Sequence, residues 1–117
     1  MNELVKKEEA LIAIPIKVYA EKALQKNLKI REGWKINKLE IQQITSILVD
    51  SEKSEFKGNL SVISQYITVN LELRTPENKL KKKPLNFTVG GRIEMSYDFE
   101  KKAYQINNED ELFLIEM

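Results

Sequence analysis

The hydrophobic and polar positions of the chain change their period near residue 17. Residues 1–9 are polar and predict a loose N-terminal segment, either frayed or a loose helical turn. The apolar run Ala10–Ile16 has isoleucines at alternate positions, and Pro15 disfavours a helix through it, so it predicts a strand. From residue 17 to residue 28 the apolar side chains instead fall on one side of a helix, and Gly33 follows its end.

After the helix, the chain alternates in the manner of β-strands. Residues 34–50 predict a strand in which the parity of the apolar positions is mixed, which indicates either burial on both faces near its end or a bulge near residues 42–43. A polar turn at 50–55 leads to residues 56–74, which predict a strand bulged or kinked near residues 64–65, where the parity slips by one.

The clearest strand of the sequence is Leu85–Phe99, in which apolar and polar residues alternate without interruption. Its Gly90–Gly91 pair offers a kink where a sheet can curl. The lysine-rich segment Thr75–Pro84, with a proline near each end, predicts a loop before this strand. A hairpin, a turn and a final apolar strand complete the pattern, at residues 100–106, 107–111 and 112–117.

These elements predict a single α+β domain over residues 1–117. Their order is β-α-β-β-β-β. The expected architecture is a long, curved antiparallel β-meander of about four to five strands, packed on or wrapped around one N-terminal helix.

The amino-acid composition excludes several kinds of functional site. The chain has no Cys and no His, which excludes disulfides, thiol nucleophiles, histidine bases and zinc sites built from those residues. Asp98 with Glu100, and Glu109 to Glu111, could be acid pairs or cation ligands, but both groups lie in predicted turns, where acidic residues are common. We therefore expect no enzymatic activity, no metal and no cofactor.

The apolar stripes of the strands have two interpretations. They could form an ordinary core under the helix, or they could line a groove for an apolar ligand. One short helix is a thin cover for such long strands, which favours a groove or a partner surface. Trp34, at the junction of helix and sheet, could close the core or anchor a ligand. The expected groove residues are Leu24, Leu28, Leu60, Val62, Phe87, Val89, Ile93 and Met95.

The lysines of the predicted loop are the densest charge cluster of a chain whose net charge is only +1. Lys79, Lys81, Lys82 and Lys83 could contact anionic lipid headgroups, or they could simply keep a loop solvated. The loop has no aromatic residue that could stack on bases, and 16 of the 19 cationic residues are lysines, so nucleic-acid binding is not expected.

The stretch from Leu39 to Met117 resembles the YceB-like envelope lipoproteins, which belong to the tubular lipid-binding superfamily. The similarity is carried by the segment Tyr97–Tyr104, in which an aromatic residue and an aspartate precede a Glu-Lys turn, a small residue and a second aromatic residue. The resemblance implies a curved sheet around a helix, enclosing an apolar groove for a lipid or another apolar molecule. The chain departs from the family in having no lipobox Cys and no long C-terminal helical part.

The function expected on these grounds is a non-enzymatic binding domain of the bacterial cell envelope. The alternative is a cystatin-like interaction module, with a helix on a sheet, that binds another protein. We expect a periplasmic location if an export signal was removed ahead of this sequence and a cytoplasmic one if the sequence is complete. The longest apolar run is too short to span a bilayer, so we expect membrane association only through a lipid anchor.

Overall fold

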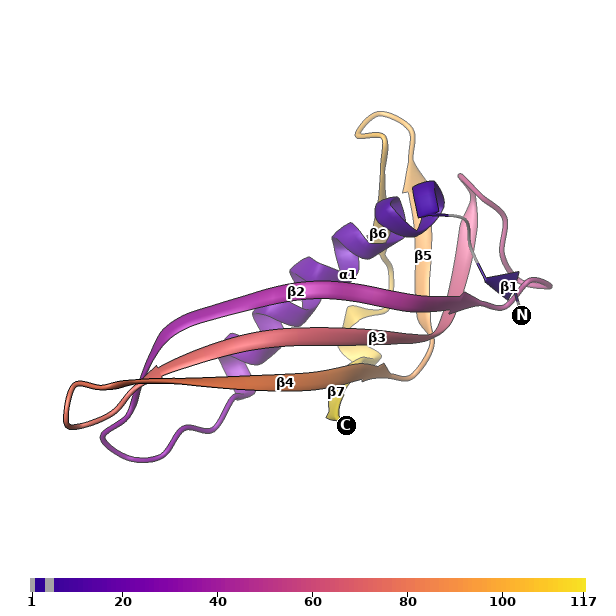
Figure 1. The fold of residues 1–117 in the computed structure, drawn as a ribbon. Coiled ribbons are helices and arrows are strands. Elements are labelled where there is room, and N and C mark those ends of the chain that lie inside the picture. The colour runs from indigo at the N-terminus through magenta and orange to yellow at the C-terminus, as the bar shows by residue number, and fades with distance from the viewer. Residues whose placement is uncertain (1, 4–5) are drawn as a thin grey trace.

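The computed structural model describes the backbone of residues 2–3 and 6–117, and the side chains from Glu8 onward. Within these residues, seven antiparallel strands form one sheet that curls around a single α-helix (Figure 1). The predicted α+β class, with an N-terminal helix and an antiparallel sheet, is confirmed. The elements are β1 (Asn2–Glu3), α1 (Lys6–Asn27), β2 (Lys35–Val49), β3 (Asn59–Arg74), β4 (Leu80–Gly90), β5 (Ile93–Asp98), β6 (Ala103–Ile106), the 3-10 turn η1 (Glu109–Glu111) and β7 (Phe113–Glu116).

The prediction of a strand at Ala10–Ile16 is wrong, because α1 includes all of it. The side chains of Ile12 and Ile16 are fully buried against the sheet, whereas Ile14 is 57% exposed, as helical spacing requires. Pro15 lies inside the helix. An interior proline costs about 3 kcal/mol. Burying two isoleucines contributes about 1.5–3 kcal/mol each, which offsets that cost.

Part of the predicted loose segment 1–9 has regular structure. The helix already includes Lys6 to Glu9, and the backbone of Asn2–Glu3 pairs with the end of β2. Residues 1, 4 and 5 of this predicted segment lie outside the described residues.

The sheet turns a corner in the middle of β3. One half of β3 pairs with β4 along Ile67–Arg74, and the other half pairs with β5 along Asn59–Val62. The predicted strand Leu85–Phe99 is therefore two strands, which break at Gly91, where φ is +88°. A residue without Cβ is suited to this conformation. The kink predicted at the glycine pair is the place where the sheet curls.

The predicted irregularities of β2 and β3 coincide with shifts in strand register. The pairing of β2 with β3 shifts between Ile41 and Gln43, as expected from the mixed parity there. It shifts again near Ser64, which pairs with Leu48, while Val62 pairs with Val49. These shifts let one strand bury apolar side chains on the same face before and after the corner.

The predicted loop Thr75–Pro84 is shorter than expected, because β4 already begins at Leu80. The backbone of Lys81 to Lys83 pairs with β3, and Pro84 is opposite Asn70. β7 pairs only with the last residues of β4, Phe87–Gly90. Pro84 therefore lies on a part of β4 whose outer edge has no partner strand, where no backbone N–H is needed.

The core lies between the buried side of α1 and the concave face of the sheet. The helix contributes a stripe at positions i, i+4, i+7, i+8 and i+12, starting at Ile12. The molecule is elongated, with principal extents of 52 × 24 × 23 Å. The β3–β4 hairpin and the loop after α1 lie together at one end, beyond the C-terminus of the helix (Figure 1). The sheet is therefore longer than its helical cover at this end.

Candidate functional site

The structure separates the eight predicted groove residues into two groups. Five of them lie in the interior around the corner of the sheet and line no hollow of the described molecule: Leu60, Val62, Val89, Ile93 and Met95. The other three, Leu24, Leu28 and Phe87, border an open cleft at the C-terminal end of α1. Leu24 and Phe87 are also buried, with 3% and 6% of their surface exposed. The apolar stripe is thus partly core and partly cleft wall.

Two adjoining hollows form this cleft, which we call the end cleft. The hollow between the last turns of α1 and β7 has a volume of about 500 Å³, and the second, over β3 and β4, has about 400 Å³. They share Leu28, Lys29 and Glu116. Each is within the usual size range of small-molecule sites. The second hollow is lined by Leu28, Lys29, Ile30, Arg31, Trp34, Leu71, Leu73, Lys81, Lys82, Lys83, Leu85 and Glu116.

The strand register explains why the second hollow has an apolar floor and a cationic rim. Leu71 is opposite Lys83 and Leu73 is opposite Lys81, and residues directly opposite in an antiparallel pair lie on the same face. Leu85, two residues after Lys83, shares that face as well. Because α1 ends at Asn27, no helix covers these positions. Leu71 and Leu85 are buried and Leu73 is partly buried against them, so the floor of this hollow belongs to the core, and Lys81 and Lys83 border it.

The charges around the second hollow are mainly positive. Lys29, Arg31, Lys81 and Lys83 line it, together with Lys82, whose side chain alternates to the opposite face of β4, across from Glu72; the single carboxylate among the lining residues is that of Glu116. The Arg31 guanidinium lies 5.2 Å from the centre of the Trp34 ring, a cation–π arrangement that holds the indole at the wall. Within the side chains described from residue 8 onward, no ion pair neutralises these five cations. The lysines predicted on a loop therefore lie mainly on a strand, where only Lys79 remains in the turn.

Tyr19 borders the other hollow, where its phenol stands beside the helix end. Burial raises the pKa of the Tyr19 hydroxyl above 10.0, and the negative charge of Glu109 raises it further. The phenol thus stays protonated at neutral pH and offers a neutral O–H group. This hollow has no cationic group besides Lys29 among its lining residues, so it suits the apolar part of a ligand.

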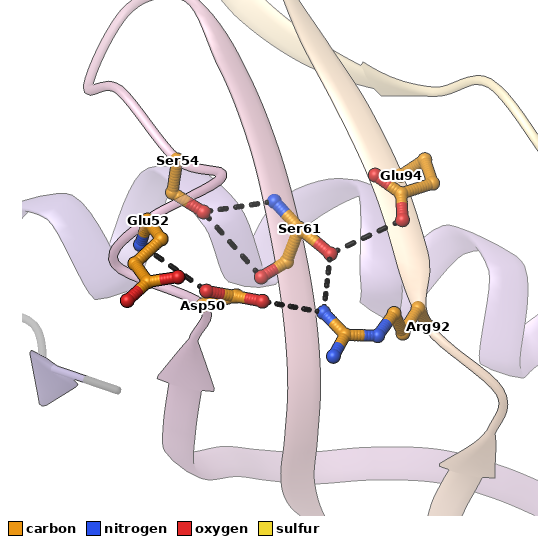
Figure 2. Close-up of polar contacts among 6 residues, drawn as sticks. All are labelled: Asp50, Glu52, Ser54, Ser61, Arg92 and Glu94. Atoms are coloured by element: carbon orange, nitrogen blue, oxygen red, sulfur yellow. Dashed lines mark hydrogen bonds and ion pairs between the residues drawn. The ribbon is translucent and has the colours of Figure 1, made fainter.

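A second cluster of polar side chains lies at the corner of the sheet (Figure 2). The Arg92 guanidinium donates to Asp50 Oδ2 at 2.8 Å and to Ser61 Oγ at 3.3 Å. Ser61 Oγ donates to Glu94 Oε1 at 3.1 Å, and its backbone N–H donates to Ser54 Oγ at 2.9 Å. A serine beside a carboxylate could suggest a nucleophile and its base.

The geometry of this cluster favours a structural role. Ser61 is fully buried, and it lines none of the hollows of the described molecule. Its hydroxyl is engaged on both sides, so no substrate atom can approach it. The contacts join the β2–β3 turn to β5 and hold the corner closed. The sequence offered one signal for this cluster, a serine between two apolar residues, Leu60 and Val62, of the strand predicted at residues 56–74.

The Asp50–Arg92 contact predicts an acid-sensitive contribution to stability. The hydrogen bond from Arg92 holds the pKa of the Asp50 carboxyl below its usual 3.8. A folded-state pKa below the unfolded one means that the stabilisation is full above about pH 4 and is lost as the pH falls through the folded value. We expect Asp50→Asn to be less stable than the natural chain at pH 7, with the difference shrinking towards pH 2. Urea unfolding at several pH values measures this; a difference that grows on acidification would contradict it.

The acidic groups singled out in the sequence have local roles. The Asp98 carboxylate accepts hydrogen bonds from the backbone N–H groups of Glu100 and Lys101, which stabilises the β5–β6 turn. Glu109, in η1, forms a salt bridge with Lys22 at 2.8 Å. Among the residues that the structure describes, no three acidic side chains gather as a metal site would require. The helix of the described chain is not long and apolar enough to cross a bilayer.

No protein-family model matches the chain, and neither a curated protein nor a solved structure shows significant similarity to it.

Proposed function

We propose that the end cleft binds an anionic amphiphile, a molecule with an apolar chain and a carboxylate, sulfate or phosphate headgroup. The observation that carries this proposal is an apolar floor that lies beyond the end of α1 and is bordered by the cationic side chains of Lys29, Arg31, Lys81 and Lys83. The resemblance to envelope lipoproteins supports a non-enzymatic binding domain of the bacterial cell envelope as the setting.

The apolar chain would supply most of the affinity. Each methylene removed from water contributes about 0.8 kcal/mol, so a chain of ten carbons offers roughly 8 kcal/mol before the cost of association is subtracted. A solvent-exposed lysine that pairs with the headgroup adds at most about 1 kcal/mol. The cations would therefore select among headgroups and set the orientation, with the chain directed past Leu28 towards the hollow beside Tyr19.

Trp34 allows this proposal to be tested directly, because it is the only tryptophan of the chain and lies in the wall of the cleft. Its fluorescence is titrated with dodecanoate and with dodecyltrimethylammonium, both below the concentration at which they form micelles. The chains are equal in length and the headgroup charges are opposite. We expect dodecanoate to bind at least tenfold more tightly.

A charge-reversal variant sharpens the titration. The double substitution Lys81→Glu and Lys83→Glu should abolish the preference for dodecanoate or invert it. The control is Lys53→Glu with Lys101→Glu, which changes the net charge equally but lies in the turns at the other end of the molecule. Equal affinity for the two amphiphiles, or an equal loss in the control, would contradict the proposed site.

The cystatin-like alternative has one observation of its own. β6 pairs with β5 on one edge only, and the exposed Ile14 and Val18 of α1 lie beside it, bordering a hollow of about 270 Å³. An extended peptide could add to this edge. A protein bound stoichiometrically at β6, together with no response of Trp34 to dodecanoate, would favour this function over the first.

A further inference from the structure

We propose that the end of the molecule beyond α1 docks onto an anionic bilayer surface, so that the end cleft faces the membrane. The docking end comprises the loop after α1, the adjacent ends of β2, β3 and β4, and the β3–β4 turn, residues 28–40 and 70–83. The orientation of the cleft towards lipid rests on the proposed function, whereas docking itself stands on the surface described below.

The charges of this nearly neutral chain are segregated along its length. Residues 28–40 and 70–83 contain nine cationic and four acidic side chains, a net charge of +5, so the remaining residues sum to −4. The fold gathers both segments, because Lys35 is opposite Arg74 and Lys38 is opposite Glu72, which is in turn opposite Lys82. Figure 1 shows the loop after α1 at the same end as the β3–β4 hairpin. One end of an elongated molecule is thus strongly positive.

Most of this positive charge is available to a partner. Within the side chains that the structure describes, the only ion pair at this end joins Lys38 to Glu40. The Arg74 guanidinium donates to the neutral amide oxygens of Asn78, at 2.7 Å, and Asn37, at 3.3 Å. These bonds fix its position and leave its charge uncompensated. Such a surface attracts an anionic membrane over a Debye length.

An exposed apolar side chain at the tip distinguishes a bilayer from other polyanions. Leu80 is 50% exposed at the start of β4, between Lys79 and Lys81, and Ile36 is exposed at the start of β2, on the other side of β3. Leucine can enter the boundary between headgroups and acyl chains while the long lysine side chains reach phosphates. Nucleic-acid surfaces of this kind instead use aromatic side chains, and at this end only Trp34 is aromatic.

The opposite end provides a matched control surface. Phe99 is 69% exposed in the β5–β6 turn, and Lys101 and Lys102 follow it. Acidic side chains balance these lysines, namely Asp98 and Glu100. The two ends therefore both expose apolar and cationic groups, but only the docking end has an excess of positive charge.

The test uses cosedimentation of the full chain with vesicles of phosphatidylcholine alone and of phosphatidylcholine mixed equally with phosphatidylglycerol. Each cation that reaches an anionic surface contributes about a fivefold increase in partitioning. We expect at least tenfold stronger binding to the anionic vesicles, weakening with added salt. The variant Lys35→Glu with Lys79→Glu should lose at least tenfold, and Leu80→Ser severalfold. None of these three residues lines the end cleft.

The controls are Lys53→Glu with Lys101→Glu, and Phe99→Ser, each of which should stay within twofold of the natural chain. Circular dichroism establishes that every variant is folded. Equal binding to both vesicles, equal losses in the controls, or tighter binding to single-stranded RNA than to the anionic vesicles would overturn the docking surface. Dodecanoate titrations of the same variants distinguish the two proposals. If dodecanoate binds but vesicles do not, the docking surface alone is refuted. If vesicles bind but dodecanoate does not, the cleft alone is refuted.

Discussion

Replacing Ile16 by Ala is expected to lower the free energy of unfolding by about 2–5 kcal/mol. The side chain is fully buried between α1 and the sheet. Its loss leaves a cavity that its neighbours on the helix and the strands can refill only in part. Urea unfolding followed by circular dichroism measures the change. This is the largest effect that we expect from any single truncation discussed for this protein.

The matched control is Ile14→Ala, which removes the same atoms from an exposed position of the same helix. Surface substitutions usually change stability by less than about 0.5 kcal/mol. The two variants also distinguish a helix from a strand at residues 10–16. In a strand, Ile14 and Ile16 would share a face, and the two variants would lose similar amounts. Similar losses would therefore contradict the helix described for residues 10–16.

Gln65→Leu is expected to cost about 1–3 kcal/mol, because it leaves a buried backbone N–H without an acceptor. Gln65 Oε1 accepts hydrogen bonds from the Val89 N–H at 2.6 Å and from Thr88 Oγ1 at 2.8 Å. These contacts bridge β3 and β4 at the corner, where regular pairing between the strands stops at Phe87. Leucine has a similar size, so the loss reports the hydrogen bonds more than the packing.

One feature of Gln65 moderates this effect. Among the described residues, its Nε2 is buried without a hydrogen-bond partner, and leucine removes that unsatisfied group as well. Thermal unfolding of Gln65→Leu is compared with that of Gln25→Leu, an exposed glutamine on α1. An equal change in Tm for both variants would mean that the amide does not secure the corner.

Local patterns in the sequence were sufficient to predict most of the irregularities of the sheet. The bulge near Gln43, the slip of parity near Ser64 and the kink at Gly91 all coincide with real irregularities of the strands. The bulge and the slip follow from the alternation of apolar and polar residues, and the kink follows from the backbone freedom of glycine. Residues close together in the sequence determine both. The prediction failed at Pro15, because the balance between a broken helical hydrogen bond and two buried isoleucines is decided by tertiary packing.

The position of the hollows also depends on tertiary structure. The helix extends over 22 residues, so it covers most of the apolar stripe that a shorter helix would have left open. The open part lies further along the sheet, over Leu71 and Leu73. A signal for it was present, since Lys81, Lys83 and Leu85 share one parity and extend the strand back into the predicted loop. The volume of the cleft, in contrast, depends on where α1 ends in space.

Nuclear Overhauser effects between bound dodecanoate and labelled methyl groups test the central claim most directly. The end cleft predicts cross-peaks from the chain to the methyls of Leu28, Leu73 and Leu85, and none to those of Val62 and Ile93, which are buried at the corner. Cross-peaks confined to Val62 and Ile93, or no cross-peaks at saturating dodecanoate, would contradict a binding site at the end of the helix.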